Sequence, residues 1–465
     1  MAAIKQNSRW LMACLLAVML LPEARPSYAQ EVRFKTLRYE EDYSAIQPDS
    51  ADFYSQVKHI PLGKKHSYLS LGGEVRYQYF WYKNPGWGSE PEDQDGFMLS
   101  RILTHADLHW GNHFRLFAQL QSSFAAGNTE PASPVDENPL DIHQLMMEAD
   151  LYAKNNQRLF LRMGRQELSY GSQRLISVRE GPNSRQSFDA ARLIYDAKYL
   201  RADAFYANYV QGRKGIFDER FWDGSSQLWG TYVTLPQISS FPGVDLYYLG
   251  LSKKSVFADA VGRERRHSLG TRIWKEASGV SFDFEAVYQF GSISMSQIRA
   301  WTVSMDASYK PHMERLAPVF GIKSELISGD RTPGDRLLNT FNPLYPRGAY
   351  FGLASLIGPY NLTDVHPYVQ WEVCRRITWS MDYDLFWRMG REDGLYAVNG
   401  ALIHDGRGIK HKGIGKQLGT DVNFRPGRFL DFKVEFTWFD TGKFLRFAGL
   451  GKSIYMAGFT AAVKY

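Results

Sequence analysis

Residues 68–82, YLSLGGEVRYQYFWY, alternate between two kinds of side chain over a long stretch. Every odd position from Leu69 to Trp81 is apolar, aromatic or glycine, whereas the even positions include Glu74, Arg76 and Gln78. Successive side chains of a β-strand point to opposite sides of the sheet. This stretch therefore predicts a long strand with one apolar face and one charged, polar face.

The same alternation recurs along the chain, at 99–110, 114–122, 280–290, 376–387 and 432–439. Strands of soluble sheets are commonly about 5–6 residues long, whereas a tilted membrane-spanning strand needs about 9–11. Several of the apolar faces end in Trp or Tyr, as in the aromatic girdles of transmembrane barrels. A soluble β-sandwich is the alternative, but the pattern favours an all-β, antiparallel transmembrane barrel with a polar lumen.

The N-terminus has the pattern of a secretory signal peptide. Two basic residues precede an apolar run over 11–21, and small residues lead up to Ala29. The run is shorter than the roughly 20 residues that a spanning helix needs. We therefore expect a signal peptide at 1–29, a periplasmic lead-in at 30–66 and an outer-membrane barrel at 67–465.

Removal of the signal peptide leaves a mildly basic chain with one cysteine. The net charge falls from +6 to +4, because three basic residues and one acidic residue are lost, and Cys374 remains. Scattered charge of this size does not favour nucleic acid as a partner. One cysteine cannot form a disulfide within the mature chain or a cysteine metal cluster.

An enzyme built on a barrel is the alternative from another class. His105, Asp107 and His109 share a strand face near Ser100, but no nucleophile motif surrounds them. Two histidines four positions apart on a strand are about 13 Å apart, too far to bind one metal ion. We therefore expect no catalytic residue, no metal site and no cofactor.

The connections and the C-terminus also fit a barrel. Long stretches rich in Gly, Pro and Asn lie at 84–96, 127–139 and 328–352, and we expect one of them to fold inward and narrow the pore. The last residues, IYMAGFTAAVKY (454–465), alternate and end on an aromatic side chain. They resemble the strand by which outer-membrane barrels are recognised, so the barrel assembly machinery is an expected partner.

Several segments resemble the alginate export family of outer-membrane porins. The most specific is LRMGRQELSYGSQRLISVREGPNSRQSFDAARLIY (161–195), and the others are LRYEEDYS (37–44), HIPLG (59–63), LSLGGEVRYQY (69–79), GDRTPGDRLLNTFNPLYPRGAYFG (329–352) and IGKQLGTDVNFRP (414–426). The resemblance implies a monomeric barrel of about 18 strands in the outer membrane of a Gram-negative bacterium. Ambiguous alternation in segments such as 201–210 leaves 16 strands as an alternative.

The resemblance also implies transport without chemistry, through an arginine-containing lumen that passes the polyuronate alginate from the periplasm to the cell exterior. The arginine fork suits planar carboxylates, and weak, repeated contacts let a polymer both bind and leave. The expected partners are an anionic polysaccharide, outer-membrane lipid and periplasmic export components. The alternative is a general or substrate-specific uptake porin for small anionic solutes or oligosaccharides.

The candidate conduit residues lie on the predicted polar faces and in the family-like segment 161–195. The cations are Arg76, Arg101, Arg115, Arg162, Arg165, Arg174, Arg179, Arg185 and Arg192, and the acids are Glu74, Asp107 and Glu167. Glu167 stands where the family pattern has a further arginine. Alternation places Arg162 inside, so Arg165 needs a β-bulge to face the lumen as well. Each arginine has a structural ion pair as its alternative role.

Overall fold

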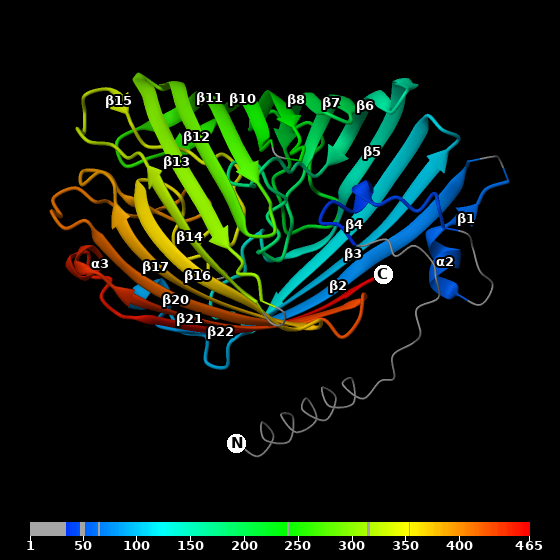
Figure 1. Cartoon of the computed structure of the whole chain (residues 1–465). Coiled ribbons are helices and arrows are strands. Elements are labelled where there is room, and N and C mark those ends of the chain that lie inside the picture. Colours follow the sequence, from blue (N-terminus) through cyan, green and yellow to red (C-terminus); the bar gives the residue numbers. More distant parts are fainter. Residues whose placement is uncertain (1–33, 47–51, 64–65, 240, 314–316, 353) are drawn as a thin grey trace, which may run out of the picture.

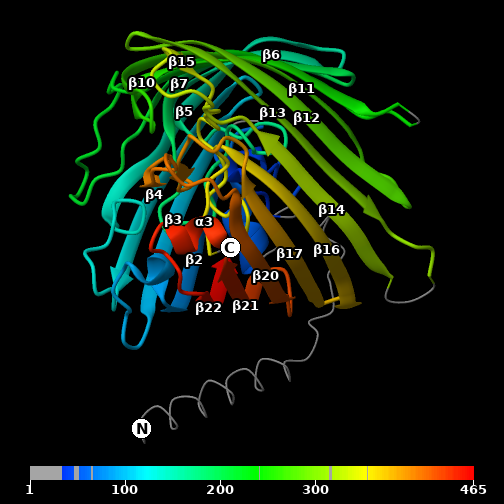
Figure 2. The same ribbon diagram turned by 90° about the vertical axis from the view of Figure 1, so that its left-hand side faces the viewer.

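The computed structural model describes residues 34–46, 52–63, 66–239, 241–313, 317–352 and 354–465. Eighteen long strands pair antiparallel with their neighbours in chain order, and the first also pairs with the last (Figure 1, Figure 2). The chain is therefore a closed antiparallel β-barrel, which confirms the predicted fold and decides for 18 strands over 16. The predicted signal peptide at 1–29 lies outside the described residues.

The wall strands are 9 to 17 residues long, as a tilted membrane crossing requires. In chain order they are β2 (Tyr68–Lys83), β3 (Phe97–Trp110), β4 (Phe114–Ala126), β5 (Asn138–Lys154), β6 (Gln157–Gln166), β7 (Phe188–Ala197), β8 (Leu200–Tyr209), β9 (Gln227–Leu235), β10 (Gly243–Val256), β11 (Val261–Lys275), β12 (Val280–Ile293), β13 (Ser296–Tyr309), β14 (Pro318–Ile327), β16 (Leu362–Cys374), β17 (Ile377–Arg388), β20 (Gly413–Phe424), β21 (Leu430–Thr441) and β22 (Ile454–Lys464). Residues 201–209 of the ambiguous segment 201–210 thus belong to a wall strand, β8.

Shorter elements lie in the lead-in and in the connections. They are η1 (Arg38–Glu40), α2 (Phe53–Lys58), β1 (Ile60–Pro61), η2 (Pro85–Gly88), β15 (Leu337–Leu338), β18 (Leu395–Tyr396), β19 (Leu402–His404) and α3 (Lys443–Phe447). Among the described residues, no helix combines the length and the apolar character that a membrane crossing needs.

The two faces of the first wall strand are sorted as the alternation predicts. On β2, the polar side chains of Glu74, Arg76 and Gln78 are at most 5% exposed, whereas Tyr77 is 51% and Tyr79 is 38% exposed. Apolar side chains outside and buried polar side chains inside are the reverse of a soluble protein. A barrel surrounded by lipid requires this arrangement.

Two connections fold into the lumen, and we call them the inner segments. One is 167–187, between β6 and β7, and the other is 328–352, which follows β14 (Figure 1). They meet at Tyr345, whose backbone N–H donates to the Leu175 oxygen at 2.8 Å. The Tyr345 oxygen accepts from the Ser177 N–H at 3.0 Å. The inward fold predicted for one long connection is thus confirmed for 328–352, whereas the inward course of 167–187 was missed.

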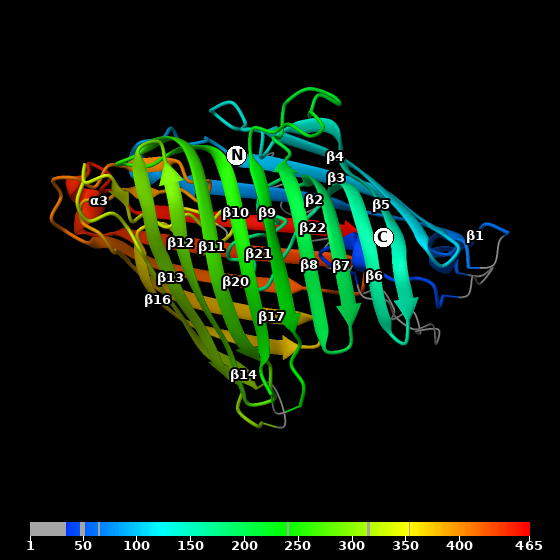
Figure 3. The same ribbon diagram turned by 90° about the horizontal axis from the view of Figure 1, so that it is seen from above.

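The described part of the lead-in packs against one end of the barrel. Figure 3 shows β1 at this end and α3 at the opposite end. The connections β3–β4 and β5–β6, at 111–113 and 155–156, are short, so we call it the short-turn end. Arg38 donates to the backbone oxygens of Gly73, at 3.0 Å, and Tyr465, at 3.1 Å, and so bridges the seam between β2 and β22.

Candidate functional site

Lumen-facing arginines gather on neighbouring strands, and we call this side of the lumen the basic wall. It comprises Arg76 on β2, Arg101 on β3, Arg115 on β4, Arg162 and Arg165 on β6, and Arg192 on β7. All are nearly or fully buried; the most exposed, Arg115, has a side chain 12% exposed. The sequence predicted all six, and the structure places each inside the barrel.

Arg101 joins the wall to the inner segment 167–187. Its guanidinium donates to Glu74 at 2.6 Å and also binds the Glu180 carboxylate. Arg76 donates to the backbone oxygens of Glu180, at 2.9 Å, and Pro182, at 2.8 Å. Burial alone would raise the pKa of Glu180, but Arg101, Arg185 and Arg76 hold it well below its usual range. Glu180 is therefore a charged anchor for the inner segment.

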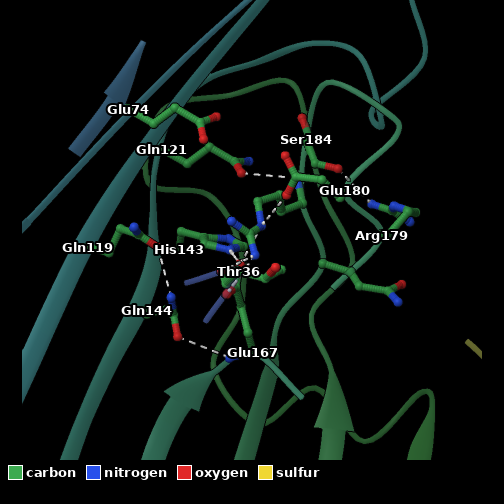
Figure 4. A network of polar contacts seen from close by, with 12 residues as sticks. Thr36, Glu74, Gln119, Gln121, His143, Gln144, Glu167, Arg179, Glu180 and Ser184 are labelled. Atoms are coloured by element: carbon green, nitrogen blue, oxygen red, sulfur yellow. Dashed lines mark hydrogen bonds and ion pairs between the residues drawn. The ribbon is translucent and has the colours of Figure 1, made fainter. Parts of the chain in front are cut away.

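Glu167 is a second anchor of the inner segment 167–187 (Figure 4). Its carboxylate lies 2.8 Å from Arg185 Nε and 2.8 Å from His143 Nε2 on β5. Arg185 also donates to the Thr36 oxygen of the lead-in at 2.8 Å. Glu167 thus ties the inner segment to the wall, and through Arg185 to the lead-in.

At the short-turn end, arginines and acids alternate around a cavity of about 870 Å³. Arg115 donates two hydrogen bonds of 2.7 Å to Asp107. Glu148 accepts from Arg162 at 2.8 Å and from Arg158 at 3.2 Å. The Arg158 side chain is 41% exposed, so this guanidinium keeps solvent access. Arg158 also donates to Asp150 at 2.6 Å, so the arginines named at this mouth of the barrel are paired with acids.

Arg165 reaches the lumen without the predicted bulge. The pairing of β6 with both neighbours is unbroken at Gly164 and Arg165, so the bulge prediction is wrong. The change of face occurs at Gly164, whose φ of 120° is a conformation that favours glycine. A Cβ atom there would lie 2.2 Å from the Leu145 oxygen.

The two remaining arginines of the basic wall are also paired. Arg165 donates to Asp189 at 2.9 Å and to Glu219, in the connection 210–226, at 3.2 Å. Arg192 binds the Asp203 carboxylate of β8. Arg165 therefore fastens another connection to the wall.

The predicted arginines of the inner segment 167–187 have different kinds of partner. Arg174 crosses to the opposite side, where it donates to Glu325 at 3.0 Å and to Glu285 at 3.2 Å. Arg179 donates to the Tyr209 hydroxyl at 3.2 Å and to the Ser184 oxygen at 3.3 Å. Within the described chain, eight of the nine predicted arginines have carboxylate partners, and Arg179 has none. The structure thus brings the candidates into several ion-pair groups.

The opposite side of the lumen, which we call the acidic wall, carries carboxylates on β13 to β21. They are Asp306, Glu325, Asp364, Asp382, Asp384, Asp421 and Glu435. A cavity of about 570 Å³ lies between this wall and the inner segment 328–352. Its lining includes Lys323 and Arg347, neither of which forms an ion pair with a described carboxylate.

Sequence reasoning missed these two cations. Lys323 Nζ lies 4.8 Å from the ring centre of Tyr368, and the Arg347 guanidinium lies 5.1 Å from that of Tyr350. Lys323 alternates with Phe320 and Ile322 on β14, so a strand pattern could have identified it. Arg347 lies in an inner segment, and no local pattern shows which cavity it reaches.

The chain matches one protein-family model and several solved structures. A family model described as alginate export matches residues 67–458. Similar solved structures include OccAB1 of Acinetobacter baumannii, with TM-score 0.56, 10% identity, and 88% of this chain and 99% of that chain covered. OccK3 (OpdO) of Pseudomonas aeruginosa has TM-score 0.54 and 10% identity, covering 85% of this chain and 95% of that chain.

OccK2 (OpdF) of Pseudomonas aeruginosa, solved in complex with glucuronate, is also similar, with TM-score 0.53 and 10% identity. The match covers 85% of this chain and 97% of that chain. At these identities the likeness concerns the fold. No curated protein sequence matches this chain.

Proposed function

The chain belongs to the alginate export family of outer-membrane porins, and on that premise we propose that it passes an anionic polysaccharide, alginate or a related polyuronate, through its lumen. Family and fold indicate a channel rather than an enzyme. We place it in the outer membrane of a Gram-negative bacterium, with the short-turn end and the lead-in 30–66 in the periplasm. The polymer then moves from the periplasm to the exterior. The family match over 67–458 carries this proposal.

The distribution of cations supports a polyuronate as the ligand. Such a polymer has a carboxylate on every sugar, and its passage needs contacts that bind and also release. Lys323 and Arg347 at the acidic wall, which form no ion pair with a described carboxylate, are the cations best able to make such contacts. We propose that the paired arginines of the basic wall shape the conduit by holding the inner segments, while these two cations meet the polymer.

Further partners follow from this location. We propose that the C-terminal strand β22 is recognised by the barrel assembly machinery, and that the short-turn end meets periplasmic export components. The lead-in packs at that end, so an export component would contact it before the wall strands.

Conductance of the purified barrel in a planar bilayer tests the proposal. We expect anion preference and block by added alginate. Arg347→Ala and Lys323→Ala should each weaken the block about tenfold, because each removes one charge-assisted contact. Arg375→Ala, at the exposed β16–β17 turn, is the matched control and should leave the block unchanged.

Cation preference without block by alginate would overturn the polysaccharide proposal and leave the barrel fold intact. Uptake of a small anionic solute by proteoliposomes would then support the alternative porin function.

A further inference from the structure

We propose that Asp364, His366 and Asp384 form a binding site for a divalent metal ion of the Zn²⁺ class. Asp364 and His366 are two positions apart on β16, so both side chains face the lumen. Asp384 comes from β17, the strand that pairs with β16. The candidate ligand atoms of the three residues lie within 4.8 Å of one another.

Asp364 supplies an independent indication of a ligand. It is 1% exposed, and neither of its carboxylate oxygens accepts a hydrogen bond from any described residue. Buried carboxylates are normally hydrogen-bonded or paired with a cation. An ion bound between the three side chains would supply the missing positive charge.

Among the described residues, no lysine or arginine forms an ion pair with Asp364; Lys323 and Arg347 line the neighbouring cavity instead. Glu325, the partner of Asp364 in the β14–β16 pairing, is a carboxylate that already accepts from Arg174 at 3.0 Å and from Tyr350 at 3.0 Å. His366 is in contact with the Asp384 carboxylate and lies 3.9 Å from Asp382. The site therefore gathers carboxylates around one imidazole.

The donor set favours a first-row transition metal over Ca²⁺ or Mg²⁺. Zn²⁺ is commonly held by three protein ligands from His, Asp and Glu at about 2.0–2.2 Å, with a fourth position open. Ligand atoms on one such ion are about 3–4 Å apart, so small side-chain shifts bring this trio into range. Ca²⁺ prefers six to eight oxygen ligands, and Mg²⁺ demands an octahedral oxygen shell. An imidazole suits neither.

The site is open to the lumen. His366 lines the cavity of about 570 Å³ beside Lys323 and Arg347, so an ion can enter from there. The expectation of no metal site rested on His105 and His109, which are too far apart on one strand to bind the same ion. These three ligands come from two strands, and their approach depends on the β16–β17 register.

Metal binding by the mature, untagged barrel in detergent tests the proposal, without any transport measurement. After chelator treatment, equilibrium dialysis should show one tightly bound Zn²⁺ per barrel, and bound Co²⁺ should give a tetrahedral visible spectrum. Asp364→Asn should weaken Zn²⁺ binding at least tenfold. Asp421→Asn, on the same wall but outside the trio, should leave it unchanged. A Cys374→Ser background removes the exposed thiol as a competing ligand.

His366→Gln provides a second variant in case Asp364→Asn prevents barrel assembly, and it should lose the Co²⁺ spectrum. Absence of stoichiometric Zn²⁺ binding by the wild type would overturn the proposal, and so would equal binding by wild type and a folded Asp364→Asn barrel. Neither result depends on which solute the porin passes, so the metal site and the proposed transport can fail separately.

Discussion

The two walls of the lumen carry opposite charge and use it in different ways. On the basic wall, Arg101 binds a carboxylate of the inner segment 167–187, and Arg165 binds one in the connection 210–226. On the acidic wall, the Asp364 carboxylate accepts no hydrogen bond from the described chain, and Lys323 and Arg347 border a cavity without ion-pair partners there. The number of arginines alone would place a path for anions along the basic wall. The ion pairs show instead that Lys323 and Arg347, two cations without a described carboxylate partner, lie at the acidic wall.

The comparison shows that a buried arginine is weak support for ligand binding. Burying an ion pair costs desolvation of both groups, and its main gain is a defined arrangement of the chain. Arg76, with two hydrogen bonds to the backbone of the inner segment 167–187, has this role. Positive charge that is already neutralised within the barrel has little left to offer a polyuronate.

The largest effect should come from breaking the basic wall. Arg101→Ala leaves the buried Glu74 carboxylate without its 2.6 Å cation and removes one partner of the half-exposed Glu180, so we expect a loss of about 3–5 kcal/mol in the free energy of unfolding. Denaturant unfolding in detergent measures it. Arg375→Ala, in an exposed turn, should change the same quantity by less than about 0.5 kcal/mol. Similar losses for both variants would remove the distinction between structural and free arginines.

A smaller loss in the free energy of unfolding should follow when the backbone that directs Arg165 into the lumen is changed. Gly164→Ala adds a Cβ atom 2.2 Å from the Leu145 oxygen at a φ of 120°, so we expect a cost of about 1–3 kcal/mol. The midpoint of denaturant unfolding is the measurement. Gly427→Ala is the control, because nothing lies within 4 Å of an added Cβ there. An unchanged midpoint for Gly164→Ala would show that the strand can adjust without cost.

The acid partner of Arg165 in the connection 210–226 should respond to pH. Burial, together with the Asp141 carboxylate, raises the pKa of Glu219 to about 8. The docked connection therefore holds this proton more tightly than a released one would. Docking should weaken as pH rises from the ordinary pKa of a glutamate to about 8, with no further loss above it.

Tryptic cleavage at Arg213 and Lys214 reports release of this connection. It should be faster at about pH 9 than at about pH 6, after correction for the activity of trypsin on a free peptide. Glu219→Gln has no proton to lose, so its corrected cleavage rate should be the same at both. A pH dependence retained in Glu219→Gln would assign the effect to another group.

The smallest effect concerns the geometry of the free cations on the acidic wall. Arg347→Lys keeps the charge but loses the fork that pairs with both oxygens of a carboxylate. We expect alginate block to weaken about two- to threefold, well short of the loss in Arg347→Ala. Conductance measurements on the two variants make the comparison. A loss in Arg347→Lys as large as in Arg347→Ala would show that charge alone does not explain the contact.

Local periodicity predicted which side chains of the wall strands point into the lumen, because that direction depends only on the position of a residue in its strand. Arg76 and Arg101 face the lumen for that reason. The inner segment 167–187 was missed because its position depends on distant contacts. The Asn183 side-chain amide, for example, donates to the backbone oxygens of Ser100 and Phe124. The approach of Asp384 to Asp364 likewise depends on strand register and has no local signature.

The bridge that Arg38 makes between Gly73 and Tyr465 has a consequence for the order of assembly. Gly73 and Tyr465 also hydrogen-bond to each other, so the two oxygens that Arg38 binds are brought together by the meeting of the first and last strands. The pair of oxygens that Arg38 binds is therefore complete only once the barrel has closed, whereas β1 pairs with β2 alone. A group that binds only the closed barrel favours closure. Arg38 of the lead-in therefore stabilises the seam between β2 and β22 at Gly73 and Tyr465.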